Sequence, residues 1–137
     1  MRNSILIRAA FFLVLSIAFG GLQAQSGVKD QVVSALGSGN ASALAKYMVA
    51  NVDMTLPVAS DYYSNAQAEQ ILRKFFDEHP PKGLTIEHEG TNRTGDSYYI
   101  GKMPTSNGDF RVTFFLKKSD AGFLVKQLRI ETSKGER

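Results

Sequence analysis

A run of alternating apolar and polar residues at positions 110–131 constrains the fold of this chain more than any other feature. The run reads FRVTFFLKKSDAGFLVKQLRIE. In its first half, apolar residues occupy every second position: Phe110, Val112, Phe114 and Leu116. Because successive side chains of a strand point to opposite faces, this spacing predicts a strand with one apolar face. Such a face is stable only when covered, and helices earlier in the chain are the expected cover.

Three upstream segments have apolar residues at helical spacing. We expect helices over residues 26–36 and 41–50, and a third helix that opens with a capping box of Ser64 and Gln67. His79 is interpreted as the end of that third helix, because the residue before a proline is pushed out of helical geometry.

Strands are expected over 51–56, 84–89 and 96–103, before the two strands of the 110–131 hairpin, while residues 58–63 are interpreted as a connector. A slip in the apolar phase between Val125 and Leu128 predicts a bulge in the last strand. The order predicts an α+β roll, with two to three N-terminal helices packed on a curved antiparallel sheet of four main strands plus a short early strand.

The first 24 residues are typical of a secretory signal peptide. Arg2 and Arg8 are followed by an apolar run over residues 9–19, and Ala24 is a small residue at the expected cut. The run is short for a membrane span, which takes about 20 apolar residues. We therefore expect cleavage after Ala24, no stable membrane anchor thereafter, and a periplasmic or extracellular protein. Residues 25–132 form the expected single domain and 133–137 a frayed tail.

Charge and cysteine content exclude several classes of function. Without Arg2 and Arg8, the 16 Lys and Arg residues fall to 14 against 13 Asp and Glu, a net charge near +1. Nucleic-acid binding normally needs a concentrated basic surface, so we expect no nucleic-acid partner. The absence of cysteine excludes disulfides, thiolate metal sites and cysteine nucleophiles.

Several short segments resemble the bacterial exported family known as domain of unknown function 4783. They are Ser38-Gly39-Asn40 with Ala43-Leu44, Asn51-Val52-Asp53 with Leu56-Pro57, Tyr63-Ser64 with Gln67 to Leu72, and Gln127 to Glu131. That family is similar in fold to the cone-shaped nuclear transport factor 2-like (cystatin-like) superfamily, whose members include isomerases, dehydratases, cyclases and binding modules. The resemblance implies a cone-shaped roll with a pocket between helices and sheet, and dimerisation through the outer sheet face is common in the superfamily.

The residues expected to line such a pocket are mostly aromatic, and they are Tyr47, Phe75, Tyr98, Phe114 and His88. Tyr98 and Ile100 are placed on the apolar face of their strand, and His88 is placed in phase with Leu84 and Ile86. Aromatic residues at such spacing also serve simply as core, and that alternative stays open.

The opposite face of the sheet is expected to carry Tyr99, Arg111 and Phe115. Aromatic residues and arginine are enriched where proteins bind one another, so this face is a candidate contact surface, most simply for a symmetric dimer. Isolated surface aromatics are also common, so the alternative is an ordinary solvated face.

No cluster of residues indicates a cofactor or a metal. Glu87 and Glu89 should point away from His88 on a strand, so that one ion could not collect all three. The function expected from the sequence is an exported, non-catalytic module that binds a small apolar ligand or a protein. The alternative is an isomerase- or dehydratase-like enzyme, which would need a carboxylate or histidine inside the apolar pocket.

Overall fold

The computed structural model describes residues 27–120 and 122–133. The predicted signal peptide, residues 1–24, lies outside this part of the chain, as do Ala121 of the last turn and residues 134–137 of the predicted tail. Within the described part, no helix has the length and apolar character needed to cross a membrane.

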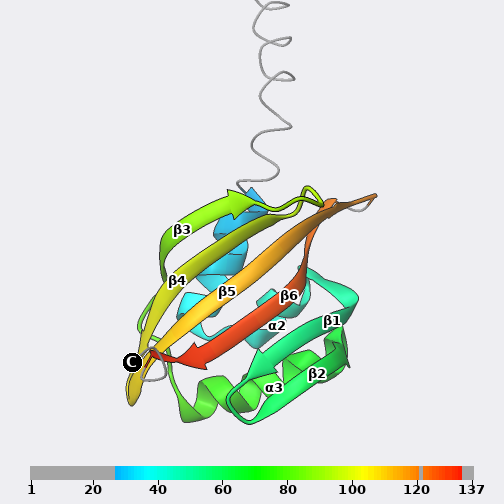
Figure 1. The fold of residues 1–137 in the computed structure, drawn as a ribbon. Coiled ribbons are helices and arrows are strands. Elements are labelled where there is room, and N and C mark those ends of the chain that lie inside the picture. The colour runs from blue at the N-terminus through cyan, green and yellow to red at the C-terminus, as the bar shows by residue number, and fades with distance from the viewer. Residues whose placement is uncertain (1–26, 121, 134–137) are drawn as a thin grey trace, which may run out of the picture.

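Three helices and six strands make up the described fold (Figure 1). They are a first helix over residues 27–38, then α2 (Ala41–Ala45), β1 (Met48–Leu56), β2 (Ala59–Ser64), α3 (Asn65–Glu78), β3 (Thr85–Thr91), β4 (Ser97–Thr105), β5 (Gly108–Ser119) and β6 (Gly122–Thr132). The strands form one sheet in the order β2-β1-β6-β5-β4-β3. The predicted α+β roll is confirmed, with helices on one face of the sheet.

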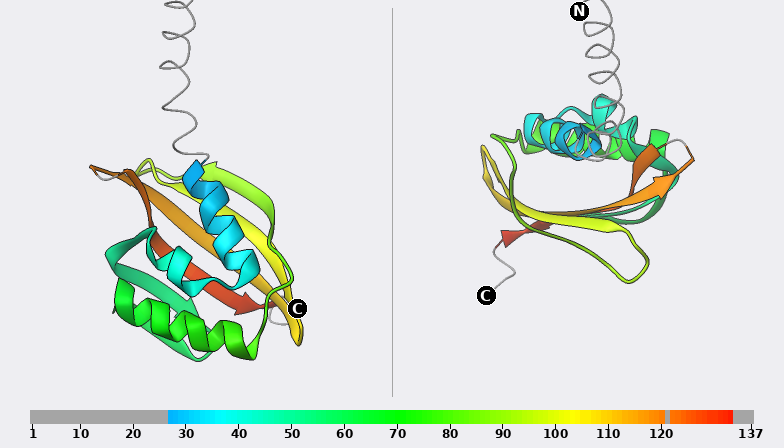
Figure 2. Two further views of the ribbon diagram at one scale, coloured as in Figure 1. Left: turned by 180° about the vertical axis from the view of Figure 1, so that it is seen from behind. Right: turned by 90° about the horizontal axis from the view of Figure 1, so that it is seen from above.

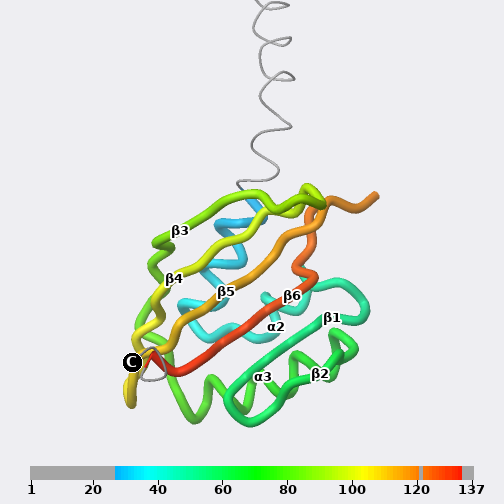
Figure 3. Tube along the Cα trace, viewed as in Figure 1, coloured from blue at the N-terminus to red at the C-terminus, as the bar shows by residue number. Residues whose placement is uncertain are grey.

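The early part of the sheet differs from the prediction in two ways. The segment interpreted as a connector contains β2, which pairs antiparallel with β1 from Leu56↔Ala59 to Asn51↔Ser64. Strand β1 also pairs with β6 in parallel, so the sheet is mixed (Figure 3 shows the two strands side by side). Neither pairing carries a local sequence signal, because the partner of β1 lies more than 70 residues away in the chain.

The second helix is shorter than its apolar spacing predicts. It ends at Ala45 instead of continuing to Ala50, and Met48 already belongs to β1. The amide of Val125 donates to the carbonyl oxygen of Tyr47 at 2.6 Å, and Met48 is the register partner of Val125. Pairing with β6 thus takes residues that local propensity would give to a helix, because most helical stability comes from tertiary packing.

The third helix is held at both ends as the sequence predicts. The Ser64 hydroxyl accepts from the Gln67 amide at 3.1 Å, and the Gln67 side chain accepts from the Ser64 amide at 3.1 Å. At the other end, the amide of His79 donates to the carbonyl of Phe75 at 2.8 Å. Both predicted boundaries of this helix are confirmed.

The helices cover the concave face of the curved sheet (Figure 2). Fully buried apolar side chains fill the space between the two layers, with Phe114 the largest of them. Leu36, Leu44 and Leu72 enter this core from the helices, and Val112, Leu128 and Ile130 enter it from the sheet. Phe75 and Phe114 belong to this one core, as the alternation in β5 requires.

Candidate functional site

The space between helices and sheet, where a pocket was expected, is packed with apolar side chains. Phe114 is wholly buried, and Phe75 is 5% exposed with its ring centroid 5.2 Å from that of Phe110. Tyr47 is half-buried and packs against the same core. In the described part of the chain, the buried polar residues are Asp96, Ser97 and Thr105, which lie beside or at the ends of β4. These residues therefore form a core, which was the alternative left open.

The predicted faces of β4 are wrong. Tyr99, expected on the outer face, is 6% exposed and stacks on Phe114 with ring centroids 5.0 Å apart. Tyr98, expected in the pocket, lies on the outer face, where its ring is 5.8 Å from that of Phe115. The register pairs Tyr99 with Phe114 and Tyr98 with Phe115, so the unambiguous faces of β5 decide those of β4.

The predicted position of His88 is also wrong. The register of β3 against β4 shifts between Ile86 and His88, which makes Glu87 the extra residue of a bulge. His88 is therefore paired with Ile100 on the outer face and is exposed. Because a shift of one residue moves every later side chain to the other face, Glu89 points inward and forms a 3.4 Å ion pair with Lys29 of the first helix. The bulge predicted in β6 is confirmed, with Lys126 as the extra residue opposite Phe115 and Leu116.

The outer face of the sheet then gathers one group of side chains, which we call the outer sheet surface. It consists of Tyr98 and Ile100 from β4 and Arg111, Thr113 and Phe115 from β5. Arg111 and Phe115 are on the face that the sequence predicts for them. Arg111 is exposed, whereas Tyr98, Ile100, Thr113 and Phe115 are half-buried.

A glycine in the edge strand supports the aromatic part of this surface. Gly90 of β3 is the register partner of Tyr98, and a Cβ at Gly90 would lie 2.6 Å from the Tyr98 hydroxyl oxygen. The Tyr98 ring therefore lies flat over the backbone of β3. With Phe115 beside it, the ring forms a low aromatic strip across three strands, which a second surface could approach closely.

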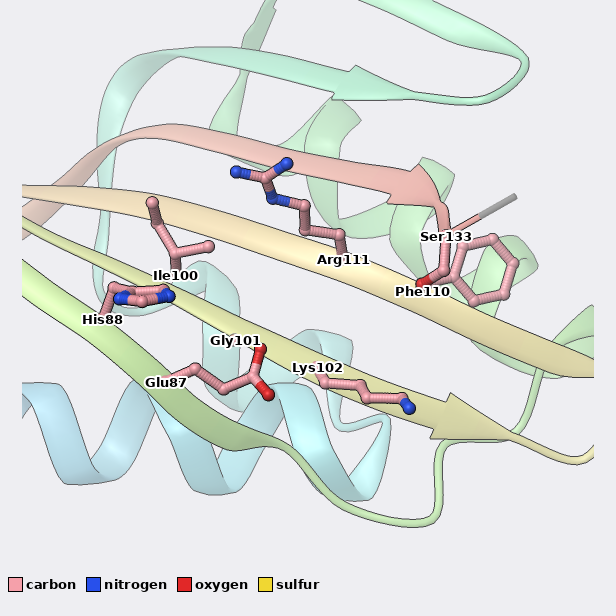
Figure 4. Close-up of a pocket in the computed structure, with 8 residues that line it drawn as sticks. All are labelled: Glu87, His88, Ile100, Gly101, Lys102, Phe110, Arg111 and Ser133. Atoms are coloured by element: carbon pink, nitrogen blue, oxygen red, sulfur yellow. The ribbon is translucent and has the colours of Figure 1, made fainter. Parts of the chain in front are cut away.

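A cleft of about 450 Å³ adjoins this strip on the outer face (Figure 4). It is lined by Glu87, His88, Ile100, Gly101, Lys102, Phe110, Arg111 and Ser133. Lys102 forms a 3.4 Å ion pair with Asp109. The mixture of charges and the open shape suit a protein contact better than a catalytic centre, which needs water excluded. In the described chain, no three His, Asp or Glu side chains are grouped so that they could hold a metal ion.

The one carboxyl group with a clearly shifted pKa stabilises the start of β4. The Lys126 ammonium, which hydrogen bonds to the Asp96 carboxylate, lowers the pKa of Asp96, while burial opposes it and the Thr94 hydroxyl (2.9 Å) adds to the lowering. The Asn92 side chain accepts from the Asp96 amide at 3.0 Å. This network ties the β6 bulge to the turn before β4, so it has a structural role.

Sequence reasoning missed Tyr98 and Ile100 as surface residues. Three consecutive apolar residues, Tyr98 to Ile100, leave the parity of β4 undetermined. The pairing of β4 with β5 through the Asn107-Gly108 turn was the available signal, since a hairpin turn fixes the register.

Comparison with known proteins gives a family and a fold. The model of the family described as "Domain of unknown function (DUF4783)" matches residues 29–131. A DUF4783 protein from Bacteroides uniformis is 30% identical, covering 76% of this chain and 95% of its own, with a TM-score of 0.70. One from Bacteroides ovatus is 32% identical over 74% and 92%, with a TM-score of 0.68. No curated protein matches the chain.

A more distant structure extends the likeness in fold alone. A protein of unknown function from Cytophaga hutchinsonii, described as NTF2-like, is 11% identical, covering 80% of this chain and 89% of its own, with a TM-score of 0.55. Together with the helix-covered curved sheet described above, these matches agree with the resemblance seen in the sequence. The chain belongs to the DUF4783 family and has a nuclear transport factor 2-like, cystatin-like fold.

Proposed function

We propose that the protein is an exported, non-catalytic module that binds a second copy of itself through the outer sheet surface. The observation that carries this proposal is the contrast between the two faces of the sheet. The inner face is consumed by the core, whereas the outer face presents Tyr98, Phe115 and Arg111, residue types that are enriched in interfaces.

The filled interior supports a binding role over an enzymatic one. An isomerase or dehydratase would need a carboxylate or a histidine in the space between helices and sheet, where desolvation tunes its pKa. In the described chain that space is lined by apolar side chains, and the acid nearest to burial, Asp96, is neutralised by Lys126 at the edge of the sheet.

The arrangement on β5 is self-complementary, and this favours a second copy as the partner. Thr113 lies midway between Arg111 and Phe115, each about 7 Å away along the strand. A two-fold axis near Thr113 would place Arg111 of each copy over the Phe115 and Tyr98 rings of the other. Such cation–π contacts form twice in a symmetric dimer, because each surface meets the same surface.

Export belongs to the same proposal and rests on the first 24 residues. Arg2 and Arg8, the apolar run after them and Ala24 form the pattern of a cleaved signal. Intact-mass measurement of protein from the exported fraction should give a chain that begins at Gln25. A product that retains Met1 would contradict cleavage without bearing on the outer sheet surface.

Sedimentation of the protein at micromolar concentration tests self-association. We expect a dimer that Phe115→Glu converts to a monomer, because two carboxylates would face each other across the axis. Val58→Glu is the matched control, since Val58 is 90% exposed at the tip of the β1–β2 hairpin, away from the outer sheet surface. A wild-type monomer, or a dimer unchanged by Phe115→Glu, would rule out this interface.

A further inference from the structure

A second hollow lies on the helix side of the sheet, between the C-terminal half of α3 and the tip of the β1–β2 hairpin. It has a volume of about 410 Å³ and is lined by Leu56, Pro57, Val58, Ala59, Ile71, Lys74, Phe75, Glu78 and His79. We call it the α3 groove. Its floor is formed by the buried side chains of Leu56 and Phe75, and its rim carries Val58, the most exposed large apolar residue described.

His79 is fixed at one end of the α3 groove by the backbone and by its neighbours. Its ring centroid lies 4.8 Å from that of Phe75 and 5.1 Å from that of Phe110. The chain just after it is clamped to the turn between β4 and β5, where the amide of Ser106 donates to the carbonyl of Pro80 at 3.1 Å. The imidazole is therefore held rigidly before any ligand arrives.

The hydrogen bonds of Asn107 determine which ring nitrogen of His79 carries the hydrogen. The Asn107 side-chain nitrogen donates to the backbone carbonyl of Glu78 at 3.0 Å, so its oxygen faces His79. That oxygen lies 2.8 Å from His79 Nδ1 and can only accept, so Nδ1 donates. Nε2 is left as the acceptor of the neutral ring, with no partner in residues 27–120 and 122–133.

The charged residues of the groove complement an acid that gives its proton to Nε2. Lys74 and Glu78 both line the groove, and neither forms an ion pair within the described chain. The Lys74 ammonium would attract the resulting anion. Glu78 and the C-terminal end of α3 would stabilise the imidazolium, because cations are favoured at a helix C-terminus.

We propose that the α3 groove binds a small apolar carboxylic acid. The apolar part lies on Leu56 and Phe75, the acid proton moves from the carboxyl oxygen to His79 Nε2, and the carboxylate then pairs with the imidazolium and with Lys74. The volume lies at the small end of the range for ligand sites, about 300–1,000 Å³, so a short acid fits better than a long lipid. This site is separate from the outer sheet surface, and either proposal can fail alone.

Proton NMR of the two histidine rings during titration with octanoate tests the site directly. The chain contains two histidines, and exposed His88 on the opposite face of the sheet is an internal control. His88→Gln assigns the two signals. We expect a saturable shift of the His79 Cε1 proton with no change at His88. No saturable shift at His79, or equal shifts at both rings, would overturn the proposal.

Matched ligands and variants then separate the apolar contact from the charge. Octylamine should not bind, and 1-octanol should bind more weakly than octanoate. Lys74→Gln should weaken octanoate about threefold to fivefold, as expected for an exposed ion pair, whereas Lys46→Gln on α2 should have no effect. Val58→Glu should abolish binding while leaving the fold intact, since Val58 is 90% exposed. Equal affinity for octylamine, or full affinity in Val58→Glu, would contradict a carboxylic acid in this groove.

Discussion

Strands β5 and β4 are neighbours in the sheet, yet only β5 shows in its sequence which face is buried. In β5, the residues between Phe110, Val112 and Phe114 are Arg111 and Thr113, so one parity is polar. In β4, Tyr98, Tyr99 and Ile100 follow one another, and both parities are apolar. The difference teaches that alternation fixes a face only where the other face is polar, and that an ambiguous strand takes its face from its partner.

The largest effect should come from two adjacent phenylalanines of β5. Phe114→Ala should lower the free energy of unfolding by about 3–5 kcal/mol, because the side chain is wholly buried. Phe115→Ala should cost about 1 kcal/mol, since its side chain is half-buried on the outer face. Urea unfolding of both variants at low protein concentration measures the difference. Equal losses would show that the faces of β5 are wrongly assigned.

The same comparison on β4 should repeat the pattern in the opposite parity. Tyr99→Ala should cost about 2–4 kcal/mol, because it removes a buried ring stacked on Phe114. Tyr98→Ala should cost about 1 kcal/mol, since that ring lies on the outer face. Thermal and urea unfolding provide the values. A larger loss for Tyr98 would restore the faces predicted from the sequence.

The two glycines of β3 and β4 sharpen the contrast by adding one methyl group to each face. At Gly101, a Cβ would lie 2.4 Å from the Thr85 carbonyl oxygen, which is backbone and cannot yield cheaply. Gly101→Ala should cost about 1–3 kcal/mol through overpacking. At Gly90, the Cβ would meet the Tyr98 ring, which can swing away, so Gly90→Ala should cost less. Comparable melting temperatures for the two variants would contradict this difference.

The smallest effect concerns Asp96 and depends on pH. Its pKa is lowered below the unfolded value of about 3.9, so its contribution to stability is full at neutral pH and is lost as pH falls through the folded pKa. Asp96→Asn should cost about 1–2 kcal/mol at pH 7, with the difference from wild type shrinking below pH 4. Urea unfolding across this pH range measures it. A constant difference at all pH values would show that the Lys126 pairing contributes nothing.

The sequence predicted those elements that local signals determine. The capping box of Ser64 and Gln67 marked the start of α3, and the alternation from Phe110 marked the buried face of β5. The phase slip around Lys126 marked the bulge in β6. In each case, the residues that cause the feature are neighbours in the chain, so the pattern is visible without tertiary structure.

The rest depends on contacts between residues far apart in the chain. The end of α2 is set by pairing of Met48 with Val125, and β2 by pairing with β1. The bulge at Glu87 moved His88 out of phase, although no residue around it signals an insertion. The outer sheet surface was therefore predicted in part, with Arg111 and Phe115 on the right face and Tyr98 and Tyr99 exchanged.

The most direct test of the central claim is an isotope-filtered NOE experiment on a mixture of 13C-labelled and unlabelled protein. Such an experiment detects contacts between copies alone. If the outer sheet surface forms the proposed dimer, NOEs should connect the Arg111 side chain of one copy with the Phe115 and Tyr98 rings of its partner. A dimer whose filtered NOEs arise elsewhere, with none at Arg111, Tyr98 or Phe115, would contradict the outer sheet surface as the contact site.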